Sequence, residues 1–225
     1  LRQWDWRAAA ISDLRRAKRI LIEGPKPPPE WNFHVRPNFE LVRSRICGLL
    51  ENLNHVENRT PLWIDFDIET NRYTQQILCV GISWSRLDSL CIPFVTRSQP
   101  YWSEEEETWI IFHLYKLLTH PYVNMRWQNG LFDAQIVYRH WHFTPRGAQD
   151  TMIAQHSLFA ALPKSLAFLA SMYADHYVYW KDEGKSADPS VPEEEGWVYN
   201  CKDCVYTREV GEVEQQTVEK FTATS

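Results

Sequence analysis

Three short acidic motifs follow one another along the chain, and the first places two carboxylates on one face. Asp67 and Glu69 stand two residues apart inside an apolar stretch. Residues i and i+2 of a β-strand point to the same side of a sheet, so these carboxylates face away from Ile64, Phe66 and Ile68. The motif therefore predicts a strand that directs two carboxylates at one spot.

The second and third motifs each place a polar pair four residues apart. Asn129 and Asp133 stand at the start of a helix predicted from Leu131 to Arg139. Tyr199 and Asp203 repeat this spacing further along the chain. Residues i and i+4 lie on the same face of an α-helix, so each helix offers one carboxylate and the last helix adds a phenol beside it.

Four carboxylates gathered inside one fold repel one another unless cations lie between them, because buried like charges cannot all stay ionised. Ligand sets made only of oxygen suit Mg²⁺ or Mn²⁺ rather than zinc. A pair of such ions can hold the attacking and the leaving oxygen of an in-line phosphoryl displacement, and no nucleophilic side chain is then needed. The motifs therefore predict a two-metal site that cleaves phosphodiester bonds.

Together the motifs resemble those of the DEDDy 3′–5′ exonucleases, specifically the proofreading domain of phage-type family A DNA polymerases. Three segments are similar to the successive exonuclease motifs of that family: LWIDFDIET, WQNGLFDAQIV and YNCKDCVYTREV. The segments DTMIAQHSL and PKSLAFLASMY resemble its connecting helices, and YWKDEGK resembles its phage-type members. The resemblance covers roughly residues 60 to 215, and three motifs in order are far more specific than any one of them.

The resemblance implies a fold, an activity and a role for each motif residue. The fold is an α/β, RNase H-like (DnaQ-like) mixed five-stranded sheet flanked by helices. Asp67, Glu69 and Asp203 would ligate the first of two Mg²⁺ or Mn²⁺ ions, and Asp67 would also bridge to the second. Asp133 would act mainly through the water shell of the second ion, and Tyr199 would orient the attacking water. The expected reaction is hydrolysis of the terminal phosphodiester bond of DNA, which releases 5′-nucleoside monophosphates.

Four further residues are candidates for substrate contacts. Tyr73 stands where family members place a residue that wedges against the terminal base. An aromatic ring there could stack on a splayed nucleotide for about 1–3 kcal/mol, and the alternative is an ordinary loop tyrosine. Thr70 and Asn129 are candidates for contacts to the backbone or the 3′-hydroxyl, and Phe132 stands in its expected place in the second motif.

Asp65 leaves a competing register open. It lies on the same strand face as Asp67, so Asp65 with Asp67 could form the acidic pair instead. Thr70, directly after Glu69, favours the register that we chose. Asp65 is then expected to be a solvated or hydrogen-bonded strand carboxylate, with support of the site as the alternative.

The cysteines favour a core rather than a metal or redox role. Cys201 and Cys204 form a C-x-x-C pair, but zinc needs two more ligands and no second pair exists. On a helix we therefore expect core positions. Five cysteines with no spaced framework and no secretory signal indicate reduced thiols and a cytoplasmic setting. No apolar run is long enough to span a membrane.

The chain divides into two parts near residue 60. Residues 1–60 are predicted as an N-terminal helical extension, with helices from Asp5 to Arg19 and from Phe39 to Leu53 and a proline-stiffened linker from Glu23 to Trp31 between them. Residues 61–225 are predicted as the exonuclease domain, which suits the size of one α/β core at 44% hydrophobic residues.

Within the second part the sequence predicts alternating strands and helices. A helix begins at the capping box of Ser103 and Glu106. The stretch from Lys181 to Gly196 has prolines and charges but no apolar periodicity, and it is predicted as an acidic loop. Strands are predicted over Leu62–Thr70, Ile77–Trp84, Ser89–Phe94 and Tyr122–Trp127.

The net charge of −5 is unusual for a nucleic-acid binder, which normally carries a basic footprint. It favours a module whose affinity for a single-stranded or frayed DNA 3′ end comes partly from a neighbour. The chain starts at Leu1 and stops after FTATS, so we expect a piece of a longer protein in which a C-terminal polymerase domain follows. The piece itself is expected to be a monomer.

Two other functions fit the same residues. A stand-alone DEDD nuclease acting on RNA or DNA would keep every motif, because nothing in the sequence visibly reads a 2′-hydroxyl. An exonuclease fold retained as an inactive DNA-binding module is the other alternative. Such relics normally lose carboxylates, and this chain keeps all four together with Tyr199.

Overall fold

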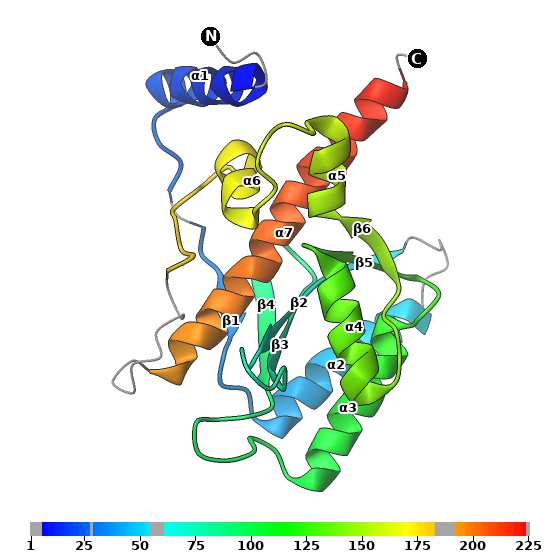
Figure 1. The fold of residues 1–225 in the computed structure, drawn as a ribbon. Helices are drawn as coiled ribbons and strands as arrows, with labels where there is room; N and C mark the ends of the chain where they lie inside the picture. Colours follow the sequence, from blue (N-terminus) through cyan, green and yellow to red (C-terminus); the bar gives the residue numbers. More distant parts are fainter. Residues whose placement is uncertain (1–5, 28, 55–60, 183–191, 224–225) are drawn as a thin grey trace.

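The fold is built on a mixed sheet of six strands (Figure 1). The computed structural model describes residues 6–27, 29–54, 61–182 and 192–223. The strands lie in the order β1-β4-β3-β2-β5-β6. Strand β3 is antiparallel to β2 and to β4, whereas β1 is parallel to β4, β5 to β2 and β6 to β5. In chain order the strands are β1 Asn32–His34, β2 Leu62–Thr70, β3 Ile77–Ser83, β4 Asp88–Pro93, β5 Val123–Trp127 and β6 Gly147–Asp150.

The α/β, RNase H-like fold is confirmed, but the sheet has one more described strand than the five predicted. Strands β1 and β6 are short, and both lie at sheet edges. Strand β1 follows the proline-rich linker and pairs with Asp88–Leu90 of β4. Segments of three and four residues are too short to show a two-residue alternation, so their strand character comes from the neighbour they pair with.

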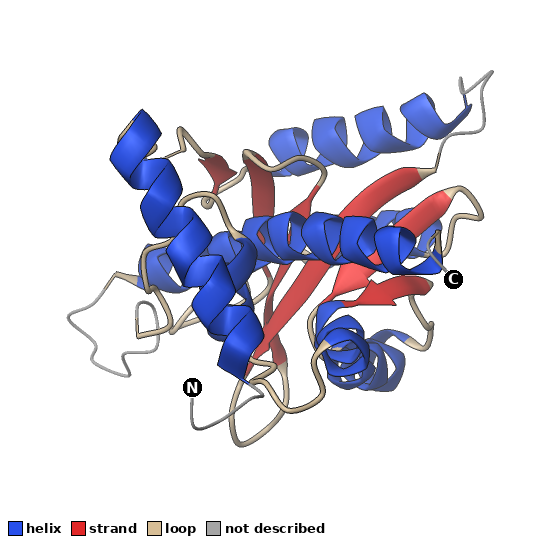
Figure 2. Cartoon of the chain, turned by 90° about the horizontal axis from the view of Figure 1, so that it is seen from above, coloured by secondary structure: helices blue, strands red, loops and turns tan. Residues whose placement is uncertain are grey.

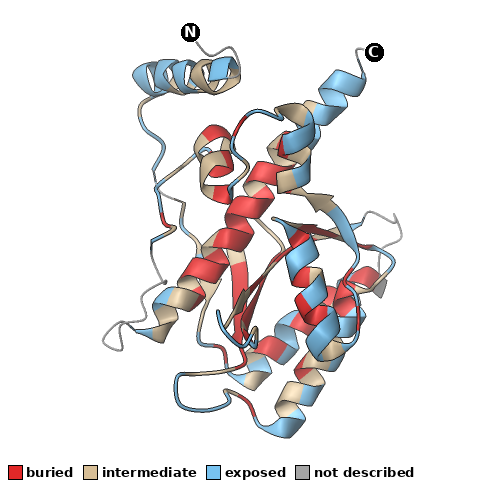
Figure 3. Ribbon diagram, in the orientation of Figure 1, coloured by how far each residue is buried: buried red, intermediate tan, exposed pale blue. Residues whose placement is uncertain are grey.

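Helices cover both faces of the sheet (Figure 2). One face packs on α2, α3 and α4 through a large apolar cluster, and the other face packs on α7, beside which α5 and α6 lie. The buried residues gather in the strands and along the middle of α7 (Figure 3). The helices are α1 Arg7–Glu23, α2 Phe39–Asn54, α3 Glu104–Leu118, α4 Gly130–Trp141, α5 Thr151–Leu158, α6 Leu166–Tyr173 and α7 Glu193–Thr222.

The first 60 residues contribute to the sheet and to its core. Helix α2 buries Val42 and Ile46 in the same cluster as the central strands, and β1 extends the sheet. Helix α1 lies against α6, where the Ser12 hydroxyl donates to the carbonyl of Met172 at 2.9 Å. A domain boundary at residue 60 stays a prediction, although the shared core is a reason to place it before Asn32.

Two local predictions have different outcomes. The capping box at α3 is confirmed, because the Ser103 hydroxyl accepts from Glu106 N and the Glu106 carboxylate accepts from Ser103 N at 3.0 Å. Residues 183–191 of the predicted acidic loop lie outside the described residues. For Glu193–Gly196 the loop prediction is wrong, since α7 begins there with three glutamates in its first turn. Negative charges at that end stabilise a helix by complementing its dipole.

None of the described helices is long and apolar enough to cross a membrane.

Candidate active site

Strand β2 places the first acidic pair as the alternation predicts. Ile64, Phe66 and Ile68 are buried in the apolar cluster on the α2 face. Asp67 and Glu69 therefore point to the opposite face, toward α7. A bulge follows between Glu69 and Thr70, at the end of the pairing with β3, and a bulge bends a strand and re-aims its side chains.

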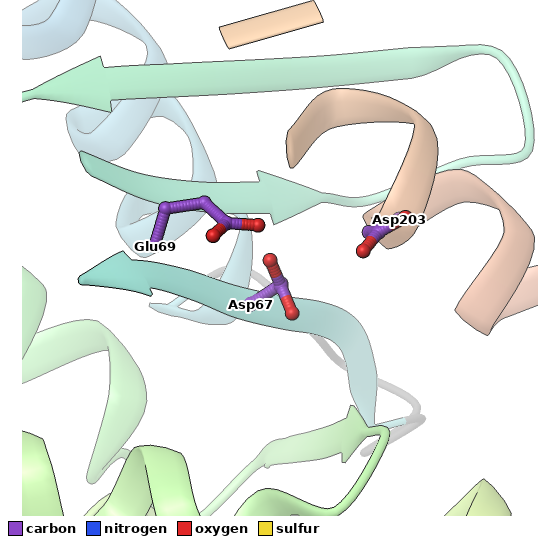
Figure 4. Close-up of side chains that lie close together, drawn as sticks. All are labelled: Asp67, Glu69 and Asp203. Carbon is purple, nitrogen blue, oxygen red and sulfur yellow. The ribbon is translucent and has the colours of Figure 1, made fainter. Parts of the chain in front are cut away.

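Three carboxylates from two elements meet on this face. Oxygen atoms of Asp67, Glu69 and Asp203 lie within 4.8 Å of one another. Figure 4 shows the first two on alternate positions of β2 and the third on α7, across from them. The geometry thus brings together the three residues that were predicted to hold the first metal ion.

The electrostatics of the cluster fit a cation. Burial raises the pKa of Asp67 well above its ordinary value, and the charges of Asp203, Glu69 and Asp133 raise it further. A carboxyl group resists ionisation in this way when nearby negative charge is not compensated. Because every donor is a carboxylate oxygen, Mg²⁺ and Mn²⁺ are the ions that suit the site.

Asp133 lies beside the cluster and is anchored to the strand. Its Oδ1 accepts a hydrogen bond from the backbone N–H of Ile68 at 3.1 Å, on the part of β2 beyond its pairing with β5. Burial raises the pKa of Asp133 to about 7. It does not belong to the three-carboxylate group, which agrees with a role through a water shell rather than as a direct ligand of the first ion.

A carboxylate with no predicted site role shapes the turn that presents Asp133. Asn129 has the left-handed conformation (φ 61°, ψ 40°) where α4 begins. Asp150, at the end of β6, accepts from the backbone N–H groups of Asn129 at 3.1 Å and of Gly130 at 2.9 Å. Asp150 also caps α5 by accepting from Met152 N. Asp150 begins the segment DTMIAQHSL, which is singled out only for its resemblance to a connecting helix, and that resemblance does not identify the turn that Asp150 stabilises.

Tyr199 and Asp203 lie one turn apart on α7, and a lysine from another segment bridges them. Lys181 Nζ donates to the Tyr199 hydroxyl oxygen at 3.0 Å and to Asp203 Oδ2 at 2.5 Å. Trp180 Nε1 donates to Asp203 Oδ1 at 2.6 Å. Burial raises the pKa of Tyr199, and the nearby carboxylates, Asp203 first, raise it further. The phenol therefore stays protonated in this site.

No residue spacing in the sequence gives Trp180 or Lys181 a place in the site. Lys181 stands at the start of the predicted acidic loop, and long-range packing onto α7 brings it to the carboxylates. The segment YWKDEGK, which resembles phage-type members of the family, is the one signal that points to these residues.

Asn200 orients Asp67 from the other side. Its Nδ2 donates to Asp67 Oδ2 at 2.8 Å. Helix α7 reaches this close because β3 has a glycine at the crossing, where a Cβ on Gly81 would lie 2.4 Å from Asn200 Oδ1 and 2.7 Å from Cys204 Sγ. Neither Asn200 nor Gly81 has a spacing that marks it in the sequence, because their contact depends on how helix α7 crosses strand β3.

An open groove of about 830 Å³ leads away from the carboxylates. Glu69 and Tyr199 line it together with Thr70 and Tyr73, two of the predicted substrate contacts, and Tyr73 is 89% exposed. Arg72 and Arg97 also line the groove, together with the acidic side chains of Glu69 and Glu193, so both signs of charge are present there.

The other two predicted substrate contacts lie away from this groove. Asn129 and Phe132 are both exposed where α4 begins, and neither is among the groove residues. A substrate role for them therefore remains a prediction that the geometry of the groove does not support.

Asp65 is fully buried and paired with two arginines. Arg126 Nη1 lies 3.0 Å from its Oδ1, and Arg208 Nε lies 2.6 Å from its Oδ2. Burial raises the pKa of Asp65 to about 6, against the opposing effect of both guanidinium groups. The ion triad joins β2 to β5 and α7, so Asp65 is a hydrogen-bonded strand carboxylate, and this geometry does not support the competing Asp65–Asp67 register.

The cysteine pair lies in the core, as predicted. Cys201 and Cys204 are fully buried free thiols on α7, and burial raises the pKa of Cys201 to about 12. Cys201 packs with Cys79, Cys91 and Trp197 between the helix and the sheet. A high pKa keeps these thiols protonated and unreactive.

The sequence model of a 3′–5′ exonuclease family matches residues 44–213 of the chain. The match runs from α2 into α7 and therefore contains every acidic residue of the site. No curated protein sequence matches the chain.

Solved structures with the same fold have low sequence identity to this chain. NrnC from Brucella melitensis has a TM-score of 0.57 at 19% identity, covering 74% of this chain and 78% of its own. The catalytic core of RRP6 from Trypanosoma brucei has a TM-score of 0.63 at 16% identity, covering 92% and 53%. RNase D from Escherichia coli, an exoribonuclease involved in structured RNA processing, has a TM-score of 0.53 at 14% identity, covering 83% and 45%. NrnC structures have also been solved with Mg²⁺ and with pGG bound.

Proposed function

The chain belongs to the 3′–5′ exonuclease family, and from this premise we propose that it hydrolyses the terminal phosphodiester bond of a single-stranded 3′ end with two divalent cations, as a DEDDy enzyme. The observation that carries the proposal is the cluster of Asp67, Glu69 and Asp203 within 4.8 Å, with Tyr199 on the same groove. A 3′–5′ exonuclease needs an acidic metal site and a residue beside it that orients water, and this cluster offers both.

Each acidic residue has a distinct task in this proposal. Asp67, Glu69 and Asp203 would hold the first Mg²⁺ or Mn²⁺ ion, and Asp67 and Asp133 would serve the second. When bound, the ions lower the pKa of the attacking water and neutralise charge that develops on the phosphate. Asn200 and Ile68 N orient two of these carboxylates through hydrogen bonds of 2.8 and 3.1 Å.

Tyr199 supplies a hydrogen-bond donor rather than a base. Its raised pKa keeps the hydroxyl protonated next to the carboxylates. A protonated phenol with a fixed oxygen can donate to the attacking water and hold it in line with the scissile bond. The tyrosine therefore positions the nucleophile without accepting its proton, and the carboxylates are the nearest proton acceptors.

A stand-alone nuclease of RNA or DNA is the first candidate for the biological setting. The structural neighbours support it, because RNase D is an exoribonuclease and NrnC was solved with pGG bound. Arg72 and Arg97 in the groove provide phosphate contacts within the chain itself.

Proofreading within a family A DNA polymerase is the second candidate. The three motifs and the segment YWKDEGK support it, since their likeness to phage-type polymerases led to this interpretation. In that setting the substrate would be a frayed DNA 3′ end, and a polymerase domain would follow in a longer chain. The monomeric state and the cytoplasmic setting stay predictions in both cases.

Matched oligonucleotides distinguish the candidates. Single-stranded DNA and RNA of one sequence, each with a 5′ label, would be digested with Mg²⁺ beside a primer-template with a mismatched 3′ end. Faster digestion of RNA or of very short oligomers would support the stand-alone nuclease. Preference for DNA with a frayed 3′ end would support proofreading. Digestion of none of them by correctly folded protein would contradict an exonuclease function.

A further inference from the structure

A short segment outside the three exonuclease motifs reaches the centre of the site. It runs from the end of α6 beside α7 and carries Trp180 and Lys181 (Figure 1, yellow to gold). Its two contacts fall on both oxygens of one carboxylate, since Trp180 binds Asp203 Oδ1 and Lys181 binds Asp203 Oδ2. The segment is therefore part of the site, although the residue roles implied by the motifs do not include it.

The hydrogen bond between Lys181 and Tyr199 can have only one direction. An ammonium group has three donors and no acceptor, so Lys181 Nζ must donate to the phenol oxygen across 3.0 Å. The phenol proton is then directed away from the lysine. A hydroxyl that accepts from the lysine can still donate its own proton, either toward the carboxylates or toward a water molecule among them.

The lysine is held firmly enough to act in this way. Its side chain is only 18% exposed, and its ammonium lies over the ring of Tyr199 as well as at its hydroxyl. Trp180, which is 1% exposed, stacks on Tyr206 of α7 with ring centroids 4.1 Å apart. An anchor ring on the neighbouring residue thus fixes the backbone that carries Lys181.

We infer that Lys181 is a positioning residue of the exonuclease reaction. It acts through Tyr199: by donating to the phenol oxygen it fixes the hydroxyl as a donor aimed at the attacking water. Its bond to Asp203 keeps the tyrosine and this metal ligand in one arrangement. The inference rests on the proposed function, because it assigns the lysine a task in that reaction.

The competing role is that of a cation that merely occupies the metal-free site. A lysine in that role would compete with the first ion, and its removal would strengthen metal binding and leave turnover intact at saturating metal. The contact to Tyr199 favours positioning, since a lysine that only balanced the charge of Asp203 would not need to donate to the phenol oxygen.

The test compares Lys181→Met, which keeps the length of the side chain, with Lys181→Arg, which keeps a donor. Lys116→Met is the control, because Lys116 is exposed on α3. The kcat and KM for a 5′-labelled DNA oligonucleotide are measured at saturating Mn²⁺. Mn²⁺ binding to the DNA-free proteins is measured by calorimetry, and their melting temperatures report the fold.

For Lys181→Met we expect kcat to fall roughly 10- to 100-fold, because a displaced catalytic group loses about that much. KM should stay within about threefold, as for an interaction made only in the transition state. Mn²⁺ should bind with unchanged or higher affinity, and Lys181→Arg should restore part of kcat. Adding Lys181→Met to Tyr199→Phe should cause no further loss, since a residue that acts through the tyrosine has no effect without it.

Three results would overturn the role of Lys181 in an active enzyme. They are an unchanged kcat for Lys181→Met, a loss of Mn²⁺ binding that explains the lower rate, and a full additional loss on the Tyr199→Phe background. A wild-type chain that binds Mn²⁺ but degrades no oligonucleotide would overturn the proposed function itself. The two failures are thus distinguishable.

Discussion

Asp65 and Asp67 lie two residues apart on one strand face, and the structure predicts opposite results when each loses its charge. Asp65 is fully buried between Arg126 at 3.0 Å and Arg208 at 2.6 Å. In Asp65→Asn, two guanidinium groups whose side chains are only 2% and 8% exposed would lose the counter-ion that they share, and among the described ion pairs Arg208 would keep only Glu212 at 3.6 Å. Removing one partner of a buried ion pair costs about 3–5 kcal/mol.

That loss is large enough to measure by thermal unfolding. In a domain of this size 1 kcal/mol shifts the melting temperature by about 2–4 °C, so Asp65→Asn should melt about 6–20 °C lower at pH 7.5. Burial, which raises the pKa of Asp65 to about 6, acts against this loss because it favours the neutral carboxyl. A melting temperature at or above that of the wild type at pH 7.5 would show that desolvation of the carboxylate outweighs its two ion pairs.

Asp67→Asn is the matched comparison. The charges of Asp203, Glu69 and Asp133 oppose ionisation of Asp67, so the neutral amide should relieve repulsion and leave the metal-free protein as stable as the wild type or more stable. Mn²⁺ binding measured by calorimetry should be lost in Asp67→Asn and retained in folded Asp65→Asn. The reasoning is refuted if Asp65→Asn melts like the wild type but loses Mn²⁺, because Asp65 would then be the ligand.

Three further changes test separate parts of the structure. Gly81→Ala should lower the free energy of unfolding by about 1–3 kcal/mol and reduce exonuclease activity, because the new methyl group displaces Asn200. A variant with wild-type activity and wild-type stability would contradict the close packing of Asn200 on Gly81. The pKa of Asp133 is about 7, so below pH 7 a proton on this carboxyl competes with the metal, and Mn²⁺ affinity should fall by up to about tenfold per pH unit. Calorimetry from pH 8 to pH 6 measures this affinity. An affinity that does not change with pH would show that the carboxyl is not coupled to metal binding. Burial raises the pKa of Glu214 to about 9, so the folded state keeps a proton that the unfolded chain loses, and stability is lost as pH rises from the ordinary value of 4.5 toward 9. Glu214→Gln should therefore melt higher than the wild type at pH 8.5 and similarly at pH 5, and an equal shift at both would rule out ionisation as the cause.

Local sequence patterns were sufficient to predict the elements that carry the carboxylates. Strand β2 runs from Leu62 to Thr70, as its alternation predicts, and α4 contains the predicted helix from Leu131 to Arg139. The spacing of Tyr199 and Asp203 correctly placed both on one helix. Patterns with a period of two or four residues depend only on neighbours along the chain, so they are visible before the fold is known.

The residues that support the site were not predictable in the same way. Asp150, Lys181 and Asn200 reach it through contacts between elements that are distant in sequence. Asp65 could be assigned only once Arg126 and Arg208 were seen on both of its oxygens. Edge strands β1 and β6 were missed for a related reason, since pairing with a neighbour defines them rather than their own composition.

The most direct test of the proposed exonuclease is the digestion of a 5′-labelled single-stranded DNA oligonucleotide by wild-type protein and by Asp203→Ala. We expect a ladder of products that shorten from the 3′ end with Mg²⁺ or Mn²⁺, no digestion with EDTA, and none with the variant at equal melting temperature. A blocked 3′ terminus should slow the wild-type reaction. Release of the label as a mononucleotide at the outset, digestion in EDTA, or full activity of Asp203→Ala would contradict a two-metal 3′–5′ exonuclease at this site.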